Sequence, residues 1–370
     1  MEKIADLAEI DELILKLKDI QDKADRKFWN VGLFPSFRFN KFWFYFRKDN
    51  SIFYTALIVK ILQDIYPYLT IKNKILIDEI IDKSTLNYSD YENSTGQKTY
   101  NFYPTKPSRH FANGLLFRHL KHFQLPDDAD DTALIYNTNA ANNIEIEWLR
   151  NKLKLHANVN GKARVGIAKN YNNWPAYSTW FGKNMPIEFD VVVHCNILAL
   201  FLKNKIQLDE NALASWEFVK ECILSKKYET NPFAVSANYA NSITIAYFVA
   251  PILRENLLPE SENVAVILKK FLSTKIKEIK INPIENAMAY TTLIKLGDKS
   301  QLYDNEANKF ENTKKFSLFL AGMLSAFTNS YIQKLASYPF FHIRWKCEAH
   351  SLAILLEAQI YSEIGQQKNT

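Results

Sequence analysis

Residues 126–136, Pro126-Asp127-Asp128-Ala129-Asp130-Asp131-Thr132-Ala133-Leu134-Ile135-Tyr136, decide how we interpret the rest of the chain. Four aspartates fall within five positions, and an apolar run follows them directly. Asp is favoured at a helix start, because its carboxylate accepts hydrogen bonds from free N–H groups and meets the positive end of the helix dipole. The stretch therefore predicts a buried helix that begins near Asp130.

The same arrangement, a small or polar cluster followed by an apolar helix with little charge, occurs six times. The six starts are Asn50, Asp130, Asp190, Asn241, Asn286 and Glu348. The intervals between them leave room for a second helix, and amphipathic periodicity predicts such helices most clearly at 210–225 and 261–275. A repeated pair of one buried and one amphipathic helix is typical of an array of α-hairpins.

We expect this array to close into a ring, because open arrays need polar terminal repeats and the last unit is as apolar as the others. The predicted fold class is therefore all-α, an (α/α)6 toroid of six helical hairpins in one domain, residues 1–370. Residues 1–27 form an N-terminal amphipathic helix packed on it. An irregular helical protein with six capped helices is the alternative that the pattern leaves open.

Residues 28–46 hold ten aromatic side chains, and Arg38, Lys41, Arg47 and Lys48 are interleaved with or follow them. We expect this segment to be a loop that lies over a cavity. β structure is expected to be minor, with a short strand near 165–167.

Composition narrows the class of protein. The 370 residues are 47% hydrophobic with a net charge of +6, and no dense block of Lys and Arg predicts nucleic-acid binding. The three scattered cysteines form no close pair, which favours a reducing, cytoplasmic location. We find neither a signal peptide nor an apolar segment long enough to span a bilayer, so the protein is expected not to be transmembrane. Nine glycines argue against nucleotide-binding loops.

Within the opening stretch, Asp128-Ala129-Asp130-Asp131 forms a D-x-D-D pattern followed by Thr132-Ala133. This resembles the acid motif of class II terpenoid cyclases of the squalene-hopene cyclase type, which share the toroid with protein prenyltransferases. The resemblance implies an isomerase that protonates an alkene of a linear isoprenoid to start cyclisation, with Asp130 as general acid and Asp128 and Asp131 as its orienting partners. Crowded carboxyl groups resist joint ionisation, so one keeps its proton. His194, on the next inner helix, is the candidate group behind the acid.

Carbocations need a dry wall of aromatic rings. We expect this wall to contain Phe53, Tyr54, Trp174, Trp180, Tyr247 and Tyr290. If the substrate is a prenyl diphosphate, the anion would be bound by Arg38, Arg47, Arg109, Arg118 and Arg344, with Lys48 and Lys346 available nearby. No cofactor is required, although Mg²⁺ would suit a diphosphate. The chain is too short for a second helical domain, so a loop, a partner protein or a second copy would close the cavity.

Three alternatives remain open. A zinc site from Asp190, His194 and Cys195 lacks the D-x-C spacing of the prenyltransferases and is disfavoured. A glycosidase would use Asp130 with Asp190 or Glu348 across a cleft. A non-catalytic toroid would bind a lipid or a peptide, and the aspartates would only cap a helix.

Overall fold

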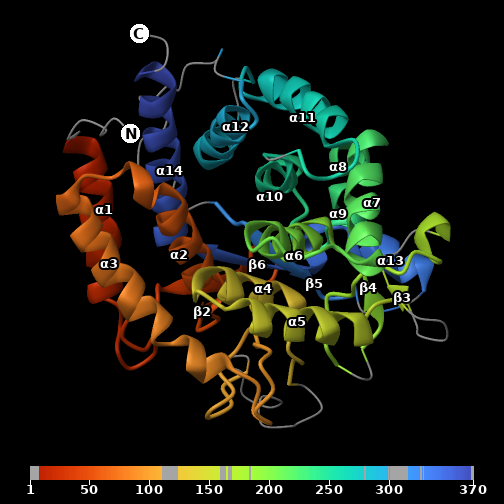
Figure 1. The fold of residues 1–370 in the computed structure, drawn as a ribbon. Coiled ribbons are helices and arrows are strands. Elements are labelled where there is room, and N and C mark those ends of the chain that lie inside the picture. Colours follow the sequence, from red (N-terminus) through yellow and green to blue (C-terminus); the bar gives the residue numbers. More distant parts are fainter. Residues whose placement is uncertain are drawn as a thin grey trace.

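The computed structural model describes residues 8–110, 124–158, 164–165, 169–182, 185–254, 256–278, 281–298, 300, 316–325, 327 and 329–367. Most of this chain is helical (Figure 1). No helix in the described ranges is both long enough and apolar enough to cross a membrane.

Six buried helices pack side by side in a closed circuit, each against the next and the last against the first (Figure 1). In order, they are α2 (Phe53–Ile65), α4 (Ala129–Thr138), α6 (Val191–Lys203), α10 (Ser242–Leu253), α12 (Pro283–Lys295) and α14 (Glu348–Gln367). Helices were predicted after six polar starts, and a helix follows each of them, although α12 begins at Pro283 rather than at Asn286.

Polar side chains fix where four of these helices begin. Asp128 accepts a hydrogen bond from the backbone N–H of Asp131, and Asp190 accepts from Val192 and Val193. Asn241 and Asn282 do the same for α10 and α12. Each cap satisfies N–H groups that have no partner within the helix. The polar-to-apolar switch in the sequence is therefore a true boundary signal.

Amphipathic helices surround this ring. Helix α1 (Ala8–Asp22) packs on α14 and α3 (Ile71–Thr85), and α7 (Glu210–Leu224) packs on α6. Helix α11 (Ser261–Lys275) contacts α7, α10 and α12. The helices expected at 210–225 and 261–275 are confirmed. The N-terminal helix is shorter than expected, and residues 1–7 lie outside the described ranges. The remaining helices are α5 (Asn143–Leu155), α8 (Lys227–Thr230), α9 (Pro232–Val235) and α13 (Ser330–Ala336), with 3₁₀ turns η1 (Tyr66–Tyr68), η2 (Tyr88–Tyr91), η4 (Lys169–Tyr171) and η7 (Pro339–Phe341).

The predicted all-α (α/α)6 class is wrong, because the chain also builds two sheets. A four-stranded antiparallel sheet has the order β2-β1-β6-β5, and β3 pairs with β4 in parallel. The fold is therefore mixed α/β. The strands are β1 (Ser36–Asn40), β2 (Tyr45–Asp49), β3 (Arg164–Val165), β4 (Ile187–Glu188), β5 (Phe319–Gly322) and β6 (His342–Cys347).

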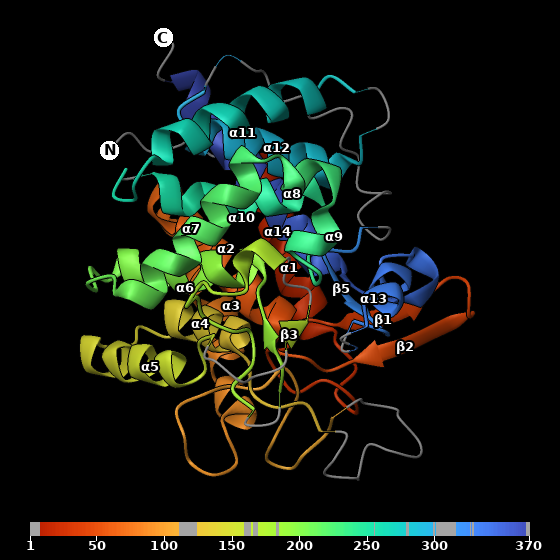
Figure 2. The same cartoon turned by 90° about the vertical axis from the view of Figure 1, so that its right-hand side faces the viewer.

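The aromatic segment expected as a loop forms the β1–β2 hairpin instead, whose strands are visible in Figure 2. Its polarity is reversed relative to an ordinary surface strand. Ser36, Arg38 and Asn40 are buried, whereas Phe37 and Phe39 on the other face are only partly buried. A pattern search that expects apolar residues to face inward misses such a strand.

The sheet lies against the N-terminal ends of two ring helices. Tyr54, at the start of α2, donates a hydrogen bond to the Trp345 carbonyl of β6 (2.6 Å). The Leu320 N–H of β5 donates to the Asn238 carbonyl just before α10 (2.9 Å). We call this end of the ring, where the sheet lies, the mouth.

Candidate acid site at the mouth of the helix ring

Asp130 lies in the first turn of α4 and is only 7% exposed. One carboxylate oxygen accepts a hydrogen bond from Asn196 Nδ2 of α6 (2.7 Å), and the other accepts from the Tyr239 hydroxyl just before α10. Burial raises the pKa of Asp130 to about 6, and these two hydrogen bonds limit the rise because they favour the ionised form. Two ring helices and the turn before a third thus converge on one carboxyl group.

Asp128 and Asp131 complete what we call the acid cluster, Asp128, Asp130 and Asp131. Burial, followed by the charge of Asp130, raises the pKa of Asp128 to about 8. Burial and the charges of Asp128 and Asp130 raise the pKa of Asp131 well above its usual range. One Asp131 oxygen is buried without a hydrogen-bond partner. Asp128 and Asp131 therefore hold protons more tightly than Asp130 does.

Asn196, and not His194, lies behind Asp130. The His194 ring pairs through Nε2 with the Tyr177 carbonyl oxygen (2.9 Å) and packs against Phe189 and Phe218. Burial lowers the pKa of His194 to about 4. Residues two apart on a helix point about 200° away from each other, so the adjoining helix was predicted correctly but not the side chain. Helix phase was the signal that would have identified Asn196.

Six aromatic rings form a group that reaches Asp130 through one member, Tyr239. They form a chain of ring contacts, with centroid separations from 5.0 Å for Phe53–Phe319 to 6.1 Å for Phe53–Phe102. Tyr239 belongs to this group and also binds Asp130, so the rings and the acid are in direct connection. We call this group the aromatic cluster: Phe53, Phe102, Tyr239, Phe248, Phe319 and Trp345.

Of the six aromatic residues expected to line a substrate cavity, only Phe53 is in the aromatic cluster. Tyr54 is adjacent to it but its hydroxyl binds Trp345. Trp174 packs on Tyr171, and Trp180 donates to Glu188. Tyr247 donates a hydrogen bond to Glu357 of α14. Tyr290 is hydrogen-bonded to Ser362, which limits the rise that burial causes in the pKa of Tyr290. Trp174, Trp180 and Tyr290 therefore have other surroundings, whereas the Tyr54 and Tyr247 rings border the aromatic cluster at Phe53 (5.3 Å) and Phe248 (5.5 Å).

The arginines expected to bind an anion do not converge. Arg38 is buried beside Asp49 (3.8 Å) and also donates a hydrogen bond to the Tyr103 hydroxyl. Its guanidinium group is therefore already engaged within the protein. Arg47 is exposed on β2, and Arg109 lines a small pocket beside Asp90. Arg118 lies outside the described residues. Arg344 alone faces a larger pocket.

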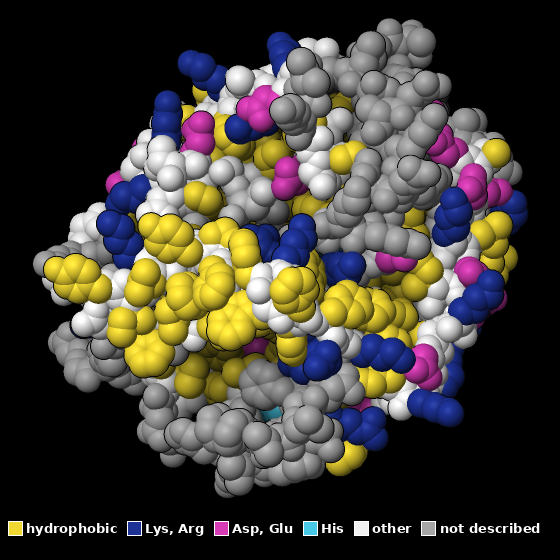
Figure 3. All heavy atoms as spheres, turned by 180° about the vertical axis from the view of Figure 1, so that it is seen from behind, with side chains coloured by type: hydrophobic (Ala, Val, Ile, Leu, Met, Phe, Trp, Pro, Cys, Tyr) yellow, Lys and Arg dark blue, Asp and Glu magenta, His cyan; other side chains and the backbone are white. Residues whose placement is uncertain are grey.

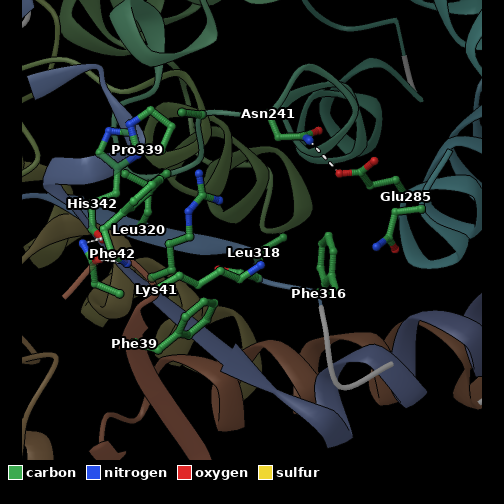
Figure 4. Close-up of a pocket in the computed structure, with 15 residues that line it drawn as sticks. Phe39, Lys41, Phe42, Asn241, Glu285, Phe316, Leu318, Leu320, Pro339 and His342 are labelled. Carbon is green, nitrogen blue, oxygen red and sulfur yellow. Dashed lines mark hydrogen bonds between the residues drawn. The ribbon is translucent and has the colours of Figure 1, made fainter. Parts of the chain in front are cut away.

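That pocket, of about 470 Å³, lies between the sheet and the N-terminal ends of α10 and α12 (Figure 4). Arg344 and Lys41 line it together with Phe39 and Phe316. On its helical side Asn241 donates a hydrogen bond to Glu285 (2.8 Å), as Figure 4 shows. Burial raises the pKa of Glu285, and the hydrogen bond from Asn241 limits the rise because it favours the ionised form.

Asp130 does not line this pocket, but it is one residue layer away. Ala240 and Leu320 line the pocket, and their chain neighbours Tyr239 and Phe319 belong to the aromatic cluster. Successive residues of a strand point to opposite faces, so Phe319 points away from the pocket that Leu320 lines. Tyr239 and Phe319 therefore form the partition between the acid cluster and the pocket.

Asp190 has a structural role at the start of α6. It accepts hydrogen bonds from the N–H of Val192, the hydroxyl of Ser236 and the N–H of Asn238. Burial raises its pKa to about 7. This favours a helix cap over the second carboxylate of a glycosidase. Among the residues that the structure describes, no group of three His, Cys, Asp or Glu side chains is arranged to hold a metal ion.

No family model, curated protein or solved structure matches this chain. Sequence reasoning found the acid cluster but missed Tyr239, whose position before α10 carries no motif.

Proposed function

We propose that this protein is a general-acid enzyme of the class II terpene cyclase type. Asp130 protonates a carbon–carbon double bond of a linear isoprenoid, the resulting cation cyclises, and loss of a different proton from the cyclic cation to water gives a product of unchanged mass, after which solvent reprotonates Asp130. The observation that carries the proposal is the geometry of Asp130: a buried carboxyl group whose two oxygens face two hydrogen-bond donors, next to two carboxyls that keep their protons.

An alkene is a very weak base, so its proton donor must leave behind a well-stabilised carboxylate. Asn196 and Tyr239 supply this stabilisation, because both donate hydrogen bonds to Asp130. Burial raises the pKa of Asp128 to about 8 and that of Asp131 well above its usual range, so both carboxyls favour their neutral forms and add little negative charge against the Asp130 carboxylate. Burial ensures that Asp130 is protonated at rest in mildly acidic solution.

The aromatic cluster supports a hydrocarbon substrate. Three of its rings pack on one another, namely Phe53, Phe102 and Phe319. The face of a phenyl ring stabilises a developing cation and offers no nucleophile to trap it. The pocket would hold the substrate on the far side of the partition formed by Tyr239 and Phe319, so proton transfer requires this partition to open at Phe319 while Tyr239 stays bonded to Asp130. A diphosphate head group would fit between Arg344 and Lys41, and Mg²⁺ would enter with it.

The test is incubation of the purified protein with geranyl, farnesyl and geranylgeranyl diphosphates, with and without Mg²⁺, followed by mass spectrometry. We expect a cyclised product of unchanged mass before loss of the head group. Turnover should fall as the pH rises through about 6, because the general acid must be protonated.

Asp130→Asn should abolish turnover and leave the circular dichroism spectrum intact, whereas Asp209→Asn, at the cap of α7, is the matched control and should stay active. Full activity of Asp130→Asn would eliminate this mechanism. Binding of isoprenoids by both proteins without turnover would instead favour a lipid-binding module, and release of sugar from a glycoside would favour the hydrolase.

A further inference from the structure

Many large apolar side chains at one end of the sheet are exposed to solvent. Phe44 is 97% exposed at the turn of the β1–β2 hairpin, and Tyr331 of α13 is 81% exposed. Figure 3 shows hydrophobic side chains gathered on the face opposite to that of Figure 1, with lysines and arginines among them. We define the aromatic surface as Phe42, Trp43, Phe44, Phe46, Met323, Phe327, Tyr331, Leu335, Tyr338 and Phe340.

The parts of this surface are held together. The rings of Phe42 and Trp43 pack on Phe340, with centroids 5.8 and 5.3 Å away. Trp43 Nε1 donates to the Phe340 carbonyl (3.0 Å), and the Asn40 side chain donates to the same oxygen (2.9 Å). The rings are therefore fixed in an exposed position by the fold, and a contiguous apolar surface of this kind marks an interaction site.

The hairpin turn is built to project a side chain. The Asn40 carbonyl oxygen of the side chain accepts hydrogen bonds from the N–H groups of Phe42 and Trp43 (2.8 and 3.1 Å). Phe44 adopts a left-handed backbone conformation, with φ of 48°, which bulky residues rarely adopt. Such a conformation is maintained where the surrounding structure requires it, and here it leaves the Phe44 ring in solvent.

The charge of these segments is one-sided. Residues 26–48 contain six Lys and Arg, of which Arg38 and Lys48 pair with Asp49 and Asp25 (3.8 and 2.6 Å), and residues 312–347 contain five; neither segment itself contains Asp or Glu. Lys41, Arg47 and Lys334 are exposed beside the rings. Lys346 lies over the rings of Phe39 and Phe46 (5.6 and 5.2 Å). The aromatic surface is therefore cationic as well as apolar.

We propose that the aromatic surface docks on an anionic phospholipid bilayer. Trp, Tyr and Phe beside Lys and Arg suit the lipid headgroup region, where rings enter the acyl boundary and cations meet lipid phosphates. A second copy of this chain would bring like charges together, which disfavours self-association. The projecting turn also suits a soft surface better than a groove does.

Docking would place the pocket at the mouth next to the bilayer. Lys41 and Phe42 of the hairpin turn line this pocket, and so does Pro339, which precedes Phe340 of the aromatic surface. Direct transfer of a membrane-dissolved substrate into this pocket depends on the proposed function, whereas docking itself does not. A failure of docking would leave the Asp130 chemistry unaffected, and the two are measured separately.

Vesicle flotation of the full chain tests the proposal, with vesicles of phosphatidylcholine alone and of phosphatidylcholine mixed with phosphatidylglycerol. We expect flotation with the mixed vesicles and a decrease at high salt. Phe42→Ser with Phe44→Ser should lower the partition coefficient by about tenfold or more, since both rings leave water on docking. Lys41→Gln with Arg47→Gln should weaken binding to the mixed vesicles only.

The matched control is Ile144→Ser with Leu155→Ser, near the two ends of α5, where both side chains are exposed to a similar degree as those of the turn. This control should float like the unmodified protein. No flotation with either vesicle, or equal losses in the control and the turn variant, would overturn the proposal. An oligomer seen by light scattering that the Phe42/Phe44 variant dissolves, or binding to an acidic protein in place of vesicles, would also overturn it.

Discussion

Asp130 differs from Asp128 and Asp131 in what its oxygens accept. Two donors from outside α4 hold it, Asn196 of α6 and Tyr239 in the turn before α10, whereas Asp128 caps its own helix and Asp131 has an oxygen without a partner. The sequence alone places three carboxyls in one helical turn, because the spacing is local. It does not identify Asn196 or Tyr239, which lie 66 and 109 positions away, because only tertiary packing brings them to Asp130.

The acid cluster predicts how stability depends on pH. The pKa values of Asp128, Asp131 and Asp190 are raised in the folded state, so their contribution to stability is complete below their unfolded pKa and is lost as pH rises through the folded values. Between pH 6.5 and 8 the folded protein still binds protons that the unfolded chain has released. The free energy of unfolding should therefore decrease over this window.

Asp128→Asn tests this directly, because Asn is an equally good helix cap but does not titrate. Its free energy of unfolding, from urea titrations at several pH values, should fall less steeply by up to about 1.4 kcal/mol per pH unit. Asn142→Ser at the cap of α5 is the control, because it exchanges one good cap for another without removing a titrating group, and it should keep the original slope. Below pH 6.5 the lowered pKa values of His194 and His350 act in the opposite direction, so only the upper window is diagnostic. A flat profile in the unmodified protein would contradict the raised carboxyl pKa values.

At the scale of elements, the helix starts could be predicted from the sequence, whereas the strands of the four-stranded sheet could not. Helix starts depend on neighbouring residues, so Asp190 or Asn241 before an apolar run was sufficient. The sheet depends on pairing between β1 and β6, which join residues such as Ser36 and Cys347 from opposite ends of the chain. The reversed polarity of β1 removed the remaining local signal. The hairpin was therefore mistaken for a loop.

The cap of α6 should be worth more than an ordinary cap. Asp190→Ala leaves the N–H groups of Val192 and Asn238 and the Ser236 hydroxyl without their acceptor inside the protein. We expect a loss of about 3 kcal/mol or more in the free energy of unfolding. Asn142→Ala at the exposed cap of α5 removes a comparable local cap and should cost about 1 kcal/mol. Equal losses in urea titration would show that Asp190 serves only its own helix.

At the scale of the molecule, α14 closes the ring by packing on both α12 and α2. Its Glu357 is fully buried and joins three ring helices, through an ion pair with Lys295 of α12 (2.6 Å) and a hydrogen bond from Tyr247 of α10. The Lys295 ammonium also lies over the Tyr247 and Tyr361 rings (5.2 and 5.3 Å). These residues are far apart in sequence, and no motif connects them.

This buried network predicts strong coupling between Lys295 and Glu357. Lys295→Met leaves the Glu357 charge uncompensated and should cost roughly 3–5 kcal/mol, whereas the exposed pair partner Lys48→Met should cost less than about 1 kcal/mol. Lys295→Met with Glu357→Leu removes both charges and strands only the Tyr247 hydroxyl, so the double variant should be more stable than Lys295→Met alone. Urea titrations of both single variants and the double variant measure this coupling. If the losses of the two single variants add up to that of the double variant, the two charges do not stabilise each other. Packing alone would then hold α14 in the ring.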